Sequence, residues 1–141
     1  KIVFTSAGNP KTWTPFLKEN GITVVHVVSS SKFALKAQEA GVDAVLLTAG
    51  WGTCHRSAVI VQRAIEESGI PTIIIAALPP VVRQNGTPRA VAPLVPMGAN
   101  AGEPNNPEMQ KAICTDSLKQ LVEIPSAGKI VPLPYEYVAK V

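Results

Sequence analysis

Short apolar runs alternate with stretches of helical periodicity over the first half of the chain. The apolar runs are rich in β-branched residues, which is typical of strands buried on both faces of a sheet. They predict strands at 1–5, 22–28, 43–48 and 72–76. Apolar positions at helical spacing predict helices at 10–20, 31–41 and 54–68. This alternation indicates βαβ units with right-handed crossovers and therefore a parallel sheet.

The alternation stops after residue 76. Residues 77–107 hold seven of the 13 prolines and predict one long loop, whose apolar residues favour a packed segment that lines a site. Helical spacing returns at 107–122, and 129–133 predicts a last strand, at a sheet edge because of Pro132. Five strands and four helices predict a single α/β domain over 1–141, with the three-layer sandwich of a flavodoxin-like fold.

A flavodoxin-like strand order of 2-1-3-4-5 would place a ligand crevice between the loops after the first and third strands. These loops are 6–10 and 49–56. In the second loop Cys54 is expected where a strand turns into a helix, and there free backbone N–H groups and the helix dipole favour a thiolate. The alternative is a structural cysteine, with Trp51 covering the edge of the sheet. The spacing leaves both hypotheses open.

Composition and charge narrow the classes of function. An apolar content of 46% with only 16% charged residues excludes a disordered chain. Aromatic residues make up 5% and basic clusters are missing, which argues against a nucleic-acid partner. No apolar run approaches the ~20 residues that span a bilayer, so no membrane association is expected. Net charge is a modest +3.

The four arginines all lie in one third of the chain, at Arg56, Arg63, Arg83 and Arg89. Arg56 adds positive potential beside Cys54, and His55 is considered as a second source. Arg83 and Arg89 are either solvated or placed to bind a substrate carboxylate, and the sequence does not decide between these.

The other polar groups predict little chemistry. Two cysteines and two histidines are too few for a zinc site or a disulfide scaffold. Cys114 and His26 are expected in the core. The glycines match neither a P-loop nor a dinucleotide fingerprint. No charged-then-apolar leader precedes the first strand, so a reducing cytoplasm is the expected location.

Four stretches of the chain carry a resemblance to a known family. They are 51–57, 62–67, 79–86 and 95–104. On these stretches, residues from about 43 to 141 resemble the selenoprotein subunits of D-proline reductase and of the related glycine, sarcosine and betaine reductases. In that family a selenocysteine precedes Gly-Thr-Cys. In this chain Trp51 stands at the selenocysteine position and Cys54 at the motif cysteine.

The resemblance implies the reductive ring cleavage of D-proline to 5-aminovalerate. The family's selenolate attacks the α-carbon of D-proline while a partner subunit holds the substrate on its pyruvoyl group, so this chain would bind no cofactor itself. Cys54 would then resolve the oxidised selenium as a selenenylsulfide. Because an indole cannot be the nucleophile, we expect the chain as given to be inactive. The carboxylate-binding roles of Arg56, Arg83 and Arg89 rest on charge and position alone.

Residues 1 to about 45 resemble part of a nitronate monooxygenase-type, flavin-dependent (β/α)8 barrel. The matching stretches are 1–10, 21–28 and 40–45. This resemblance implies a scaffold only, because that family's flavin-phosphate site and catalytic base lie outside the matching stretches. The two resemblances together suggest a chimera, and a competing hypothesis is a non-enzymatic chimeric or fragment scaffold. A third hypothesis, disfavoured by the missing phosphate site, is flavin mononucleotide bound in the predicted crevice.

Overall fold

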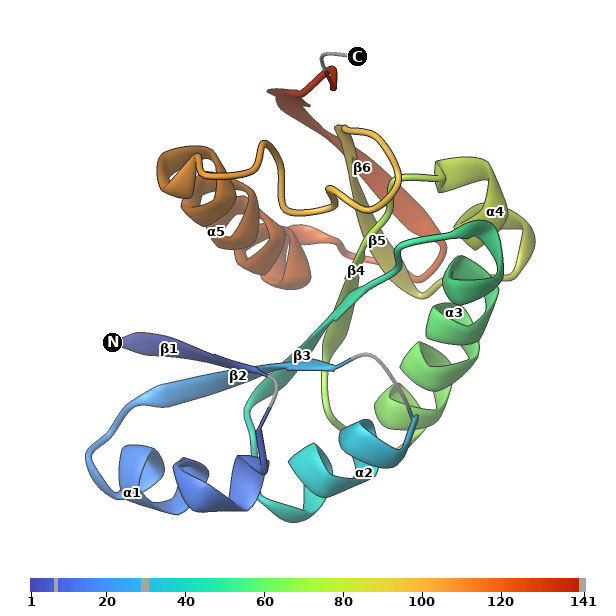
Figure 1. Cartoon of the computed structure of the whole chain (residues 1–141). Coiled ribbons are helices and arrows are strands. Elements are labelled where there is room, and N and C mark those ends of the chain that lie inside the picture. The colour runs from blue at the N-terminus through green and yellow to red at the C-terminus, as the bar shows by residue number, and fades with distance from the viewer. Residues whose placement is uncertain (7, 29–30, 140–141) are drawn as a thin grey trace.

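All six strands that the structure describes run parallel in one sheet, with helices on both faces (Figure 1). The computed structural model describes residues 1–6, 8–28 and 31–139, and only the backbone at 6, 28 and 31–34. The strands are β1 (Ile2–Ser6), β2 (Thr23–Val28), β3 (Ala44–Thr48), β4 (Thr72–Ile75), β5 (Arg89–Leu94) and β6 (Lys129–Glu136). The helices are η1 (Pro10–Thr12), α1 (Thr14–Glu19), α2 (Ser31–Glu39), α3 (Gly52–Glu67), α4 (Pro79–Gln84) and α5 (Pro107–Glu123).

The parallel α/β architecture is confirmed, and all five predicted strands form. The prediction of one loop over 77–107 is wrong, because α4 and a sixth strand, β5, lie within it. Pro79 and Pro80 open α4, where their missing N–H groups are not needed for helical hydrogen bonds. The true loop after β5 is 95–106, and it crosses the carboxyl edge of the sheet to reach α5 (Figure 1).

The strand order is β1-β2-β3-β4-β5-β6, which corrects the predicted order of 2-1-3-4-5. The order does not reverse anywhere in the sheet. Since β2 pairs with both β1 and β3, the loops after β1 and β3 do not border a common crevice. The predicted switch-point crevice is therefore not formed, and the hypothesis of flavin mononucleotide bound there loses its geometric basis.

Two apolar cores lie on opposite faces of the sheet. One face packs against α1 to α4, through residues such as Ala37, Val59 and Val82. The other packs against α5, through Ile113 and neighbouring strand residues. Because the strands advance in one direction while α5 covers the opposite face, the β5–α5–β6 crossover has the opposite hand to the other four (Figure 1). The prediction that every βαβ crossover is right-handed therefore does not hold for the whole sheet.

Candidate active site

The turn that joins β3 to α3 places residues 51 and 54 together at the carboxyl edge of the sheet. Trp51 is the N-cap of α3, with an extended backbone and an indole that is 68% exposed. Cys54 is the third residue of the helix and is exposed. Side chains at the N-cap and third helical position lie close enough to reach each other's backbone in a capping box. This spacing favours contact between the two side chains, and both residues are exposed.

The start of α3 carries no side-chain cap. The Trp51 side chain accepts no hydrogen bond from the first turn, so the N–H groups there lack the acceptor that a polar N-cap residue supplies. An added Cβ at Gly50 or Gly52 would meet nothing within 4 Å, so the backbone on both sides of Trp51 faces open space. An anionic side chain at position 51 would find donors and room in this turn.

His55 fixes the backbone of the turn from inside. Its side chain is fully buried, and its Nδ1 lies 2.6 Å from the carbonyl oxygen of Trp51. The N–H of Leu78 donates to its Nε2 at 3.1 Å. Since Nε2 must accept from Leu78, the hydrogen-bond pattern assigns the proton to Nδ1, which donates to Trp51. His55 therefore ties the N-cap residue to the segment that follows β4.

Asn100 holds the same turn from the 95–106 loop. Its side chain is 7% exposed, and Nδ2 donates to the carbonyl oxygens of Ala49 at 2.6 Å and Ile75 at 3.1 Å. One amide group thereby joins the carboxyl ends of β3 and β4. Sequence analysis did not single out Asn100, whose only signal was its position within the matching stretch 95–104. It considered His55 only as a source of positive potential beside Cys54, and it missed the role of the imidazole in holding the turn.

The structure separates the three arginines proposed for the site. Arg56 is exposed on α3, two residues beyond Cys54, and Arg83 is exposed in the last turn of α4. Arg89 begins β5 at the opposite edge of the sheet, where its Nη2 lies 2.8 Å from Glu66 Oε2. Glu66 is twelve residues beyond Cys54 on α3, which corresponds to about 18 Å of helix rise. Arg89 therefore lies far from Cys54, and this placement does not support the predicted role of Arg89 in binding a substrate beside that thiol.

Replacement of Arg89 is expected to affect stability. Arg89 and Glu66 are both mostly buried, Arg89 Nη1 donates to the carbonyl oxygen of Leu121, and Glu66 accepts two hydrogen bonds from Thr72. Arg89→Met should lower the free energy of unfolding by about 1–3 kcal/mol, because charged hydrogen bonds are lost and Glu66 is left unpaired. Urea denaturation measures this loss. An unchanged midpoint would show that the pair contributes nothing.

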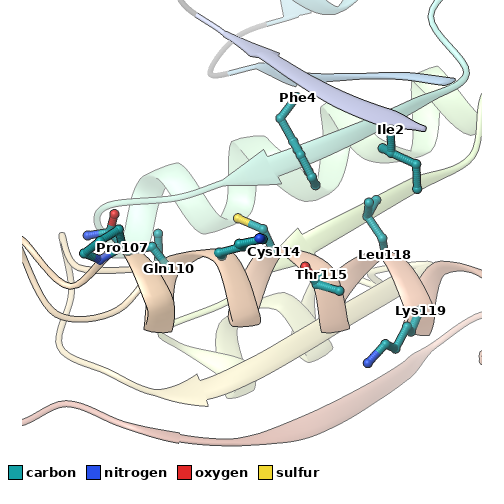
Figure 2. Close-up of a pocket in the computed structure, with 10 residues that line it drawn as sticks. Ile2, Phe4, Pro107, Gln110, Cys114, Thr115, Leu118 and Lys119 are labelled. Atoms are coloured by element: carbon teal, nitrogen blue, oxygen red, sulfur yellow. The ribbon is translucent and has the colours of Figure 1, made fainter. Parts of the chain in front are cut away.

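A separate groove of about 740 Å³ lies between β1 and α5 (Figure 2). It is lined mostly by apolar groups, among them Ile2, Phe4 and Leu118, and Lys111 and Lys119 are also among its lining residues. Cys114 also lines it and is half-buried, so the prediction that Cys114 belongs to the core is only partly correct. His26, by contrast, is 2% exposed and lies 2.6 Å from Thr5 Oγ1, as expected for a core histidine.

The two thiols are expected to differ in reactivity. Burial raises the pKa of the Cys114 thiol, so a smaller fraction is thiolate at a given pH. Alkylation of Cys114 should therefore be slower than that of exposed Cys54 at pH 8, and its rate should still rise above the pH at which a free thiol is half-ionised. Peptide mapping after iodoacetamide treatment separates the two sites. Equal rates would contradict the burial of Cys114.

Neither a membrane span nor a metal site is found in the described part of the chain. No helix there is long and apolar enough to cross a membrane. No group of three or more His, Cys, Asp or Glu side chains within residues 1–6, 8–28 and 31–139 is arranged to hold a metal ion.

Comparison with known proteins identifies relatives of the chain. No family model matches the chain. Over 110 residues, or 78% of its length, the chain is 93% identical to D-proline reductase subunit gamma of Acetoanaerobium sticklandii. The chain resembles a D-proline reductase gamma subunit. This confirms the resemblance inferred from the four stretches.

More distant relatives are subunits of related reductase complexes. The chain is 38% identical over 103 residues to the glycine reductase complex component B subunit gamma of Peptoclostridium litorale. It is 36% identical over 72 residues to the sarcosine reductase complex component B subunit beta of Peptoclostridium acidaminophilum. These matches cover 67% and 51% of the chain. Together these identities show that the chain is similar to subunits of D-proline, glycine and sarcosine reductases.

The chain spans just under half the length of the D-proline reductase gamma subunit, 46%, and 24% and 16% of the two distant relatives. These relatives do not test the resemblance of residues 1–45 to a nitronate monooxygenase-type barrel. That resemblance and the chimera stay predictions.

Proposed function

We propose that the chain is the redox-active part of a D-proline reductase gamma-type subunit, in which residues 51 and 54 form the reactive pair. The observation that carries this proposal is the placement of both side chains at the exposed, uncapped start of α3. The 93% identity to the gamma subunit supports it. The partner would be the reductase subunit that holds the substrate on its pyruvoyl group.

Each residue of the pair would have a defined task. A selenolate at position 51 would accept hydrogen bonds from the first turn of α3, which lowers the cost of its charge. It would attack the α-carbon of D-proline, so that the Se–C bond forms, the C–N bond breaks, and the nitrogen keeps the electron pair and takes a proton. Cys54 would then attack selenium, forming the S–Se bond, while the released carbon takes a proton. An external dithiol would supply the two electrons that restore the pair.

The residue at position 51 limits this activity. The Trp51 indole has no ionisable nucleophile, so we propose that the chain as given does not cleave D-proline. Arg56 and Arg83 remain candidates for binding the substrate carboxylate, because both are exposed cations on the helices that follow β3 and β4.

The proposal is tested by restoring the nucleophile. The chain with selenocysteine in place of Trp51 is mixed with the other subunits of the A. sticklandii enzyme, dithiothreitol and D-proline, and 5-aminovalerate is measured by chromatography. We expect product from this variant and none from the unchanged chain or from the selenocysteine variant that also carries Cys54→Ser. Absence of product, while the native gamma subunit is active in the same mixture, would overturn the proposal for this chain.

A further inference from the structure

The turn that carries residues 51 and 54 is held at two points, one to the end of β4 and one to the segment that follows it, and both contacts are made by polar side chains. At the first point, the Asn100 amide bridges the carbonyl oxygens of Ala49 and Ile75. Two carbonyl oxygens that lie close together repel each other. The shared Asn100 donor offsets this repulsion between Ala49 and Ile75. Asn100 is 7% exposed, and loss of its donors would leave both carbonyls without this partner.

At the second point, His55 links the carbonyl of Trp51 to the N–H of Leu78. The Trp51 carbonyl also accepts the helical hydrogen bond from the His55 N–H at 3.0 Å. With its carbonyl held by two donors, residue 51 has a fixed backbone orientation, and this sets the direction in which its side chain leaves the helix start. The imidazole is fully buried between the two segments that it joins.

We propose that Asn100 and His55 are positioning residues for the reactive pair. They keep the turn at the carboxyl end of β3 in the geometry that brings side chain 51 against Cys54. This inference rests on the proposed function, because it assigns a purpose to the contacts only if positions 51 and 54 react with each other. It also gives the 95–106 loop a task, since the loop supplies Asn100 across the carboxyl edge of β4.

The chain contains a matched control for Asn100 in Gln62. Gln62 is a fully buried amide on α3 whose Nε2 donates to the carbonyl oxygen of Arg89 at 2.7 Å, and its Oε1 accepts from Thr87. It thus makes the same kind of contact, an amide donor to a strand carbonyl, at the opposite edge of the sheet. Disturbing Gln62 should lower stability without moving the pair.

The experiment measures how strongly the protein favours a bond between residues 51 and 54. All variants carry Trp51→Cys, and the equilibrium constant for the 51–54 disulfide is measured against dithiothreitol, with the thermal midpoint recorded in parallel. Asn100→Asp replaces the donor by a carboxylate of the same shape, and Gln62→Glu does the same at the control site. We expect Asn100→Asp to lower the constant about tenfold, or about 30 mV. Gln62→Glu should change it less than about threefold, although both variants lose thermal stability.

Each outcome decides one of the two proposals. If Trp51→Cys alone forms no 51–54 disulfide, the proposed function fails together with this inference. If the disulfide forms but Asn100→Asp shifts its constant no more than Gln62→Glu does, the positioning role is overturned and the proposed function stands. Should Asn100→Asp not fold, His55→Leu provides the same measurement at the second contact, with the same tenfold loss expected.

Discussion

Cysteine in place of Trp51 is expected to form a disulfide with Cys54. The two positions are the N-cap and third residue of α3, the spacing at which Cys-X-X-Cys pairs sit at a helix start. The Trp51 indole is 68% exposed, so its removal leaves no buried cavity. After treatment of Trp51→Cys with oxidised glutathione, mass spectrometry should show the loss of two hydrogens. Proteolytic mapping should place the bond between residues 51 and 54.

A second N-cap tryptophan supplies the control for this disulfide. Trp13 caps α1 and is 62% exposed, but it lies in the unit that follows β1, with β2 between that strand and β3. Trp13→Cys should therefore leave Cys54 free under the same oxidation. Two free thiols at positions 51 and 54 of the oxidised Trp51→Cys variant would contradict the geometry of the candidate site.

Local patterns were sufficient to predict most of the strands and helices. The apolar runs of β2, β3 and β4 contribute residues to the cores on both faces of the sheet, as is typical of strands in a parallel sheet. The region of α4 and β5 was predicted as a loop because prolines dominate it. In the structure Pro79 begins a six-residue helix and Pro93 lies next to the end of a strand, and proline is tolerated at both places.

Strand order could not be predicted from these patterns. An apolar strand followed by an amphipathic helix looks the same whether the next strand is added to one side or the other. The face that α5 covers is equally invisible, because β4 and β5 are apolar on both faces. The flavodoxin-like order was an analogy, and the crevice derived from it depended on that order alone.

The candidate site was predictable only where it is local in sequence. Trp51 and Cys54 lie in one motif, and a strand followed by a helix places them at the carboxyl edge. The Asn100 contact to Ala49 joins residues 51 positions apart, and the His55 contact to Leu78 joins residues 23 apart. Arg89 was assigned to the site by charge, and no local feature showed that its strand begins at the far edge.

Gly102→Ala is expected to lower the free energy of unfolding by about 2–4 kcal/mol, because a positive φ and a tight contact add their costs. Gly102 has φ +103°, and an added Cβ would lie 3.0 Å from Ile113 and from Met109 on α5. Gly98→Ala is the matched control, with φ +88° and nothing within 4 Å of the added atom, so only the backbone cost of about 1–2 kcal/mol remains. Urea denaturation of both variants measures the difference. Equal losses would mean that the 95–106 loop, which also carries Asn100, is not held by this contact with α5.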